Sequence, residues 1–314
     1  MTTATRTTAN PEPMKGPSSA ARIVRSTLKF CRRYPLGAIG AVMALVLLGM
    51  AIFPALFTPM ASQDPLKQAL GARLEGPSWS HWFGTDELGR DLYARIVYGA
   101  RTSITIGFGV VLLSQGLAVV IGTVSGYFGG WLDSLLQRII DVGIAIPGLV
   151  FIILVVVTLS PRMPSVLFLS GDMVALILSL SILIASSASR TVRGVALSLR
   201  TEQYVEAASA LGASHTRIMR KHIVPNLFSV VIVSATILVG SAVLIESALS
   251  FLGYGVQPPT PSWGRMLNDA RRNLTYAPHM AIFPGLVIFM TVYSFNMLGD
   301  ALRDKLDPRL RGAN

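Results

Sequence analysis

Long apolar runs alternate with polar and glycine-rich stretches along most of the chain. About 20 consecutive apolar residues are enough to cross a lipid bilayer as an α-helix. Six runs meet this description and are predicted as spanning helices: residues 36–58, 102–126, 139–159, 173–189, 227–250 and 281–298. The first run is longer than the apolar core of a signal peptide, so we expect it to remain as a membrane anchor. The pattern predicts an all-α membrane protein with six transmembrane helices.

The fourth run differs from the others because it is short and rich in serine. Its hydroxyl-bearing residues are Ser179, Ser181, Ser186, Ser187 and Ser189. In a membrane helix such hydroxyls bond back to carbonyls of their own helix or across to a neighbouring helix. We therefore expect this helix to lie inside the bundle.

Composition and charge fit a membrane protein with both termini in the cytoplasm. The 314 residues are 52% hydrophobic and 14% charged, against roughly a quarter charged in soluble domains. In a soluble chain, the net charge of +11 would suggest a nucleic-acid partner. Here, 18 of the 27 Lys and Arg residues fall on the side that holds the termini. The positive-inside rule explains that excess, so we expect a lipid partner and no nucleic acid.

The segments outside the spans have different expected roles. Residues 1–20 are predicted to form a disordered cytoplasmic tail, and residues 301–314 a second one. For residues 21–35, a basic amphipathic helix on the membrane surface and a simple basic flank remain equally open. Residues 59–101 are predicted as an extracytoplasmic loop. In it, Asp86 is expected to cap a short helix containing Arg90, Asp91 and Arg95, which either packs by salt bridges or contacts the substrate.

Residues 201–226 form a polar stretch between two spans, within the predicted transmembrane core 102–300. Good helix formers run from 197 to 211, and Gly212 falls where a left-handed residue closes a helix. Ser214 can cap a second helix, which Pro225 is expected to end. The sequence predicts a cytoplasmic helix–turn–helix that another protein binds; an ordinary polar loop is the alternative.

Motifs for chemistry on a substrate are absent from the sequence. It contains no G-x-x-x-x-G-K-[ST] phosphate loop, nucleophile elbow or H-E-x-x-H. The single Cys31 and four scattered histidines give no metal-ligand pattern. We therefore predict no catalytic residue, metal or cofactor. The spans are nearly free of charge, and Glu246 is the main exception, expected near the outer end of its helix. It is either a hydrogen-bonded carboxylate at the interface or, with Ser250, part of a translocation path or outer gate.

Several motifs resemble those of a known family. Glu206-Ala207-Ala208, followed by Gly212 and Pro225, looks like the EAA loop of permease subunits of bacterial ABC importers, although His222 and Val224 replace the usual Ile and Leu. The sequences FGTDELGRD at 83–91, GARTS at 99–103 and ESALSFLGYGVQPPTPSWG at 246–264 are similar to the second permease of dipeptide and oligopeptide importers. The resemblance covers most of the chain after Tyr34.

The resemblance implies the type I ABC importer permease fold, in a bacterial cytoplasmic membrane. The expected partners are a second permease subunit, two cytoplasmic ATPase chains that hydrolyse the ATP, an extracytoplasmic solute-binding protein and a peptide substrate. The expected ATPase-coupling positions are Glu202, Tyr204, Glu206, Ala207, Ala208, Gly212, Ala213 and Pro225. Nickel-importing relatives are similar, so the solute stays open between peptide and nickel. An ion-coupled secondary transporter, a membrane-embedded enzyme and an efflux permease are further alternatives.

Overall fold

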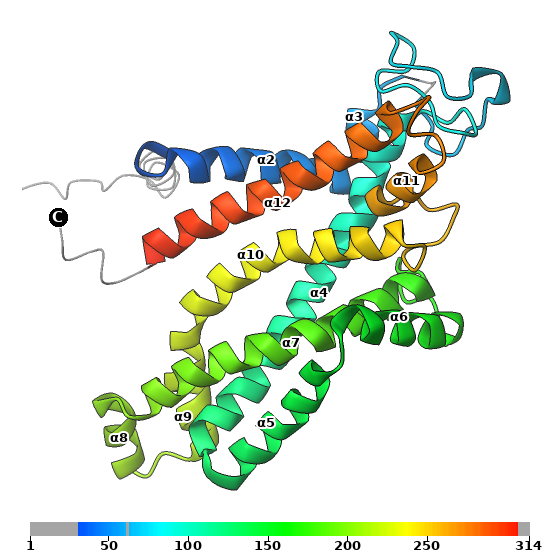
Figure 1. Ribbon diagram of the computed structural model, residues 1–314. Coiled ribbons are helices and arrows are strands. Elements are labelled where there is room, and N and C mark those ends of the chain that lie inside the picture. Colours follow the sequence, from blue (N-terminus) through cyan, green and yellow to red (C-terminus); the bar gives the residue numbers. More distant parts are fainter. Residues whose placement is uncertain (1–30, 61–62, 307–314) are drawn as a thin grey trace, which may run out of the picture.

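Helices make up nearly all the regular structure. The computed structural model describes residues 31–60 and 63–306, and within them the β-structure is limited to two isolated bridges. The helices are α2 (Pro35–Ile52), α3 (Pro54–Phe57), α4 (Leu92–Phe128), α5 (Gly130–Ala145), α6 (Gly148–Leu159), α7 (Gly171–Arg200), α8 (Gln203–Ala210), α9 (His215–Ile218), α10 (Val224–Phe251), α11 (Trp263–Ala270) and α12 (His279–Leu306) (Figure 1). The predicted all-α class is confirmed.

The described helices include the six predicted membrane crossings. Five helical segments are long and apolar enough to cross a bilayer, and α5 with α6 provides a sixth if that bent pair is one span. The two helices of the pair meet at an angle of 87°. Pro147 lies between them with an extended backbone, because proline lacks the N–H that would continue the helix. The third predicted span is therefore broken.

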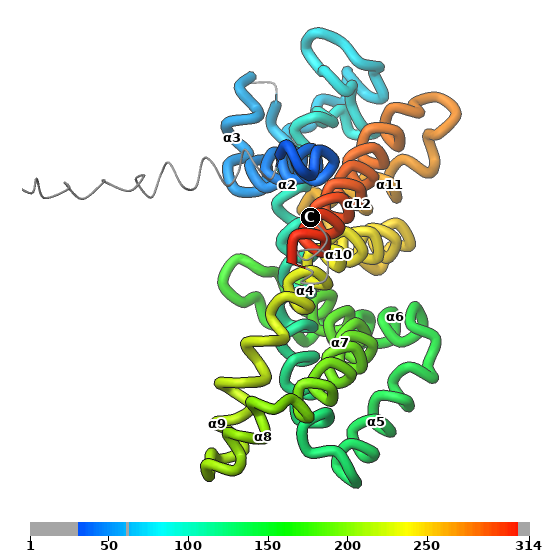
Figure 2. The backbone as a smooth tube through the Cα atoms, turned by 90° about the vertical axis from the view of Figure 1, so that its left-hand side faces the viewer, coloured from blue at the N-terminus to red at the C-terminus, as the bar shows by residue number. Residues whose placement is uncertain are grey.

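The helices form two groups joined by α4. Helices α2, α12 and α10 pack in succession on one side of α4, and α7, with α5 and α6, packs on the other (Figures 1 and 2). The short helices α8 and α9 lie at one end of this bundle, which we call the hairpin end. The connections 63–91 and 252–278 lie at the opposite end, which we call the loop end (Figure 1).

The contact between α4 and α7 depends on small residues. Gly122 and Gly126 lie one turn apart on α4 and are buried against α7. A Cβ atom at Gly122 would lie 2.7 Å from the carbonyl oxygen of Ser189, closer than atoms pack. This is the small-xxx-small spacing that lets membrane helices approach closely. The two backbones can meet only because these positions carry no side chain.

Serines complete the contact between the two helices. Ser181 donates a hydrogen bond to the carbonyl oxygen of Val110 on α4 at 3.2 Å. Ser179, Ser186 and Ser189 donate to carbonyl oxygens of α7 itself. Ser181 and Ser189 are fully buried, so the expectation that the serine-rich helix lies inside the bundle is confirmed.

Two helices extend beyond the predicted spans. Helix α4 begins at Leu92, so ten residues of the predicted loop 59–101 are helical, and α12 continues to Leu306, beyond the predicted core limit of 300. Apolar run length does not report helical residues outside the apolar run. Residues 1–30 and 307–314 lie outside the described residues, and with them the predicted tail 1–20, most of the segment 21–35 and the end of the C-terminal tail.

Alanine substitutions at two glycines of α4 should distinguish the contribution of helix packing to stability from that of helix propensity. Gly122→Ala places a methyl group against the α7 backbone, so we expect a loss of about 1–3 kcal/mol in the free energy of unfolding. Gly116→Ala is the matched control, because no atom lies within 4 Å of its Cβ position. It should be neutral or gain up to about 1 kcal/mol from helix propensity. Thermal unfolding in detergent measures both; equal stability of the two variants would contradict the packing argument.

Candidate functional site: the α8–α9 hairpin

A break in the backbone separates the hairpin from the preceding span. Helix α7 ends at Arg200, and Glu202 has an extended backbone that starts α8. The prediction of one continuous helix over 197–211 was therefore wrong. Sequence propensity could not locate the break, because the residues around it are good helix formers. The break lets α8 change direction and fold back on the bundle.

The turn after α8 has the geometry of a Schellman motif. The N–H of Gly212 bonds to the carbonyl oxygen of Ser209 at 2.9 Å, and the N–H of Ala213 bonds to that of Ala208 at 3.1 Å. Gly212 has a φ of +77°, a conformation that costs little only in glycine. The expected closing role of Gly212 is confirmed. Ser214 occupies the N-cap of α9, but its side chain makes no capping hydrogen bond.

The buried side of the hairpin is apolar and packs on the bundle. Val205 of α8 and Ile218 of α9 contact Val192 and Ala196 of α7 in one cluster, which Ala208 and Ala213 flank. The two flanking alanines belong to the turn just described. Their small side chains therefore serve both the Schellman motif and the fit of α8 against the membrane helices.

Aromatic and histidine side chains attach the hairpin to other helices. The Tyr127 hydroxyl at the end of α4 lies 2.8 Å from Nδ1 of His215 in α9. Tyr204 of α8 lies beside the His222 ring, and its hydroxyl accepts a hydrogen bond from the Asn226 side chain at 3.3 Å. The hairpin is thus tied to α4 and α10 as well as to α7.

Pro225 does not end a helix, contrary to the prediction. Residues His215–Phe251 run as one helical segment, in which Met219–Ile223 form a π-helical turn. Pro225 lies in the first turn of α10, directly after this wider turn. The wider turn changes the backbone pairing just where proline has no N–H to donate. The hairpin therefore continues directly into a membrane span.

The other side of the hairpin is exposed. Glu202, Glu206, Ala207 and Gly212 all face outward, and neither glutamate forms an ion pair with a described residue. Leu211, at the tip, is 88% exposed. Sequence reasoning missed Leu211; a leucine beside the turn glycine in a polar loop was the available signal. This surface can bind a protein through one apolar contact and two free carboxylates.

A groove lies between α8 and the end of α4. Its volume is about 610 Å³, and its lining includes Tyr127, Phe128, Arg200, Glu206 and His215. The groove therefore combines aromatic rings with both signs of charge. It adjoins the exposed surface of the hairpin through Glu206, which belongs to both.

Two ion pairs connect α5 to α7 near the hairpin end. Arg193 donates to Asp133, which also accepts from Ser125 of α4. Arg190 pairs with Asp141. These pairs hold the bent α5–α6 unit to the helix that leads into the hairpin. Motion of the hairpin would therefore reach α5 through α7.

Glu246 and Ser250 lie together at the loop end of α10. The Ser250 hydroxyl donates to the Glu246 carboxylate at 2.6 Å, and that of Ser247 at 3.4 Å. Glu246 thus has hydrogen-bond partners, as one of the two interpretations expected, and both Glu246 and Ser250 are buried. The burial results from α11, which follows α10 and covers it. Trp263 of α11 is fully buried and donates its indole N–H to the carbonyl oxygen of Ile96 at 2.9 Å.

A buried charge cluster organises the loop end around Asp86. Its carboxylate accepts hydrogen bonds from the Arg90 side chain at 2.7 Å and from Arg95, and Arg95 also reaches Asp269 of α11 at 3.5 Å. Asp91, rather than Asp86, caps α4 by accepting from the Ala94 N–H. The predicted cap was therefore wrong. Asp86 instead satisfies arginines that burial has removed from water, which supports salt-bridged packing for this segment.

The environment of Asp86 also affects its protonation. Burial alone would raise the pKa of Asp86. The Arg95 and Arg90 guanidiniums and the backbone N–H groups of Arg90 and Leu88 outweigh it and hold the pKa below its usual range. The carboxylate is therefore ionised at neutral pH, where both arginines need its charge.

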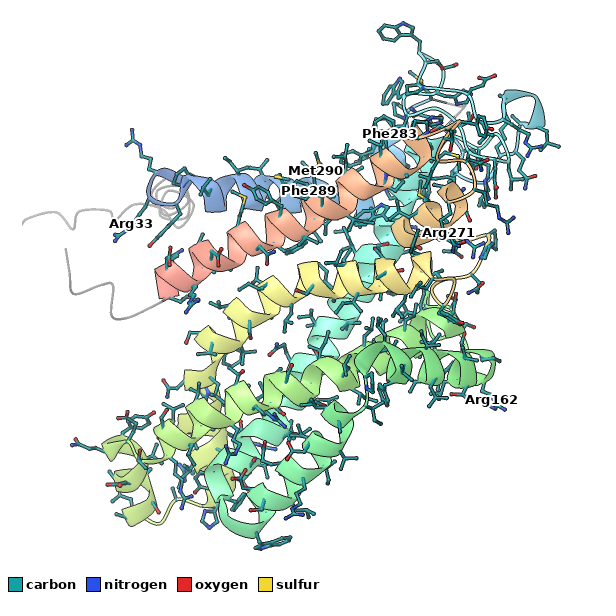
Figure 3. All side chains as sticks on the ribbon, viewed as in Figure 1. Arg33, Arg162, Arg271, Phe283, Phe289 and Met290 are labelled. Carbon is teal, nitrogen blue, oxygen red and sulfur yellow. The ribbon has the colours of Figure 1, made fainter. Side chains whose placement is uncertain are left out.

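Beside this cluster, the loop end presents a small polar pocket. It measures about 200 Å³ and is lined by Glu87, Arg265, Asn268, Asp269, Arg271 and Arg272. Arg271 projects from the end of α11 (Figure 3) and lies over the Phe251 ring. Arg265 pairs with Asp269 at 3.0 Å. Within residues 31–60 and 63–306, no group of three His, Cys, Asp or Glu side chains is arranged to hold a metal ion.

Comparison with known proteins identifies the family to which this chain belongs. Residues 118–312 match the family described as the binding-protein-dependent transport system inner membrane component. The chain belongs to this family and is an inner-membrane permease component of an ABC importer.

Relatives narrow the class to the peptide and nickel subfamily. The chain is 39% identical over 272 residues to the dipeptide transport system permease protein DppC of Alkalihalophilus pseudofirmus, covering 86% of each chain. It is 38% identical over 281 residues to the glutathione transport system permease protein GsiD of Escherichia coli O6:K15:H31, covering 90% of this chain and 89% of that one. GsiD of Shigella boydii gives the same values. The suspected resemblance to a C-type permease is confirmed.

Neutralising Asp86 should destabilise the loop end and change its response to acid. Because the pKa is lower in the folded state, the ionised carboxylate stabilises the fold. That contribution is complete above about pH 4 and is lost as the pH falls through the folded-state pKa. Asp86→Asn should therefore lose about 3–5 kcal/mol of the free energy of unfolding at pH 7 and unfold at a lower temperature. Its stability should also fall less steeply than that of the wild type as the pH is lowered. Thermal unfolding between pH 7 and pH 3 measures both effects.

The exposed Asp64 provides the control for this experiment. Asp64→Asn should leave both the stability and its pH profile close to those of the wild type, since among the described residues this carboxylate accepts a hydrogen bond from the nearby Leu66 N–H alone. Identical pH profiles for Asp86→Asn and the wild type would show that Asp86 does not provide the acid-sensitive contribution.

Proposed function

We propose that this subunit forms half of the translocation path of an ATP-driven importer of dipeptides or oligopeptides. The names of its relatives, a dipeptide and a glutathione permease, favour a peptide solute over nickel. In this proposal its partners are a second permease, two cytoplasmic ATPase subunits that hydrolyse the ATP, and an extracytoplasmic solute-binding protein. The excess of Lys and Arg in the two terminal segments and in the loops on their side of the predicted spans supports a cytoplasmic position for the hairpin and for both termini.

The observation that carries the proposal is the unpartnered outer surface of the hairpin. Glu206 on α8 and Gly212 in the turn are both exposed, and the N–H groups of Gly212 and Ala213 close the turn by hydrogen bonds. Apart from its own chain neighbours, no atom of the described residues lies within 4 Å of the Cβ position of Gly212, so this position is open. We assign this surface, with Glu202, Ala207 and the tip residue Leu211, to contact with an ATPase subunit.

Coupling follows from the rigid attachment of the hairpin. Tyr204, Ala208 and Ala213 hold α8 on the bundle, and Pro225 lies where α9 passes into α10 without a loop. When the ATPase subunits close on ATP, a push on the hairpin would be transmitted to α7 and α10. This would bias the bundle from an inward-facing toward an outward-facing arrangement as a rigid-body switch. The solute itself undergoes no chemical change.

We propose an outer-gate role for Glu246 and Ser250. Their hydrogen-bonded pair is buried in α10 where α11 packs closely, since a Cβ atom at Gly264 of α11 would lie 2.7 Å from Ser250 Cβ. An opening at this end would have to move α11 relative to α10. The pair would then stabilise the closed arrangement.

Substitutions in the hairpin test the coupling role. Gly212→Val strains the turn, because a β-branched residue disfavours positive φ, and Glu206→Lys reverses an exposed charge. Each should reduce ATP-dependent uptake of a labelled dipeptide in proteoliposomes at least about tenfold, the effect of losing roughly 1.4 kcal/mol of coupling. Glu75→Lys, on an exposed loop-end residue, controls for charge reversal. Wild-type uptake by both hairpin variants would refute the coupling assignment.

Replacement of Glu246 should affect transport without affecting attachment of the ATPase subunits. Glu246→Ala removes the carboxylate that Ser250 and Ser247 bond, so we expect altered peptide uptake with the ATPase subunits still attached. Co-purification of the ATPases measures attachment, and proteoliposome uptake measures transport. Unchanged uptake would leave Glu246 with a packing role alone.

A further inference from the structure

A cavity at the loop end is lined by four segments of the chain, three of which contribute polar side chains. It has a volume of about 440 Å³. It lies between the end of α2, residues 101–105 of α4, the start of α7 and the 252–262 connection. Its polar lining consists of Arg101, Thr102, Thr105, Ser170 and Thr260. No acidic residue lines it, so the cavity offers hydrogen-bond donors and one positive charge.

Arg101 is held in place at this cavity without an opposing charge. Its Nε donates to the carbonyl oxygen of Ala51 at 3.1 Å, and its Nη2 donates to that of Ile52 at 3.3 Å. Both carbonyls belong to the last turn of α2. Arg101 forms no ion pair with any residue of 31–60 or 63–306. The guanidinium is therefore positioned, and its charge is not neutralised by the protein.

The start of α7 adds donors to the same cavity. Ser170 is the N-cap residue of this 30-residue helix, but its side chain makes no capping hydrogen bond. Its hydroxyl oxygen is buried and has no partner among the described residues. The nearby Asp172 is engaged elsewhere, since it accepts from the Gln257 N–H at 2.8 Å. A buried unpaired hydroxyl, a helix N-terminus and an arginine together match an anionic oxygen ligand.

The surroundings of the cavity identify the kind of anion. Ile52 and Phe168 line it and are 59% and 70% exposed, and the neighbouring Phe53, Leu56 and Leu167 are exposed as well. Helix α2 ends here, so the cavity lies at the level where a bilayer passes from hydrocarbon to headgroup. A ligand in this place meets donors on one side and apolar surface on the other.

We propose that this cavity binds the phosphate group of a membrane phospholipid. Arg101, the Ser170 hydroxyl and the threonine hydroxyls bond the phosphate oxygens, and the acyl chains lie along Ile52 and Phe168. The arrangement ties α2, α4 and α7 together through the lipid. The proposal does not depend on the transported solute or on the role of the hairpin.

Native mass spectrometry of the purified transporter, with its partner subunits, tests this site. Delipidated samples are offered either phosphatidylglycerol or a glucosyl diacylglycerol with the same acyl chains and no phosphate. The wild type should retain phosphatidylglycerol and not the glycolipid. Arg101→Gln should reduce that retention about tenfold or more, and the isosteric Thr105→Val severalfold. Thr105→Val leaves the Arg101 contacts to α2 in place, so it reports on the site if Arg101→Gln fails to fold.

Arg162→Gln is the matched control. Arg162 is an exposed arginine at the same end of the bundle (Figure 3), and within the part of the chain that the structure describes it donates to the Thr158 carbonyl oxygen alone. Its replacement should leave lipid retention unchanged. Equal retention by the wild type, Arg101→Gln and Thr105→Val would overturn the proposal. The proposal would also be overturned if the cavity retained a free dipeptide in place of phospholipid and did not retain the same dipeptide as its C-terminal amide. The cavity would then bind the carboxylate of the solute.

Discussion

The close contact between α4 and α7 is the constraint on which the rest of the structure depends. Gly122 and Gly126 bring the two backbones together, and Ser181 of α7 adds a hydrogen bond to the Val110 carbonyl oxygen of α4. Away from water, packing and internal hydrogen bonds are what hold membrane helices together. Helix α7 leads into the hairpin and α4 leads to the loop-end cluster, so both functional ends of the molecule are built on this contact.

The hairpin shows how a short motif can serve structure and function together. Ala208, Gly212 and Ala213 form a turn closed by two backbone hydrogen bonds, while Glu206 and Leu211 are exposed on its outer side. The same residues therefore keep the backbone rigid and leave a surface for a partner. Because α9 continues into α10 without a loop, a force on this surface would meet a membrane span rather than a flexible connection.

The two ends of the bundle differ in how their charged side chains are paired. At the loop end, Asp86, Arg90, Arg95 and Asp269 neutralise one another in a buried cluster. At the hairpin end, the carboxylates of Glu202 and Glu206 remain unpaired within the described chain. Charges that the protein satisfies itself belong to its own packing, whereas charges that it leaves exposed are available to other molecules.

The sequence by itself determined the helical class, the apolar runs, the family motifs and the turn at Gly212, because hydrophobic length and the conformational demand of positive φ are local properties. It misplaced the α7–α8 break, the role of Pro225 and the α4 cap, and it did not report that Glu246 is buried. Each of these depends on distant partners: α8 is held by Val205 against α7, the π-helical turn carries the chain past Pro225, Arg95 engages Asp86, and α11 covers Glu246. Only the tertiary structure decided them, since burial and pairing are made by segments far apart in the chain.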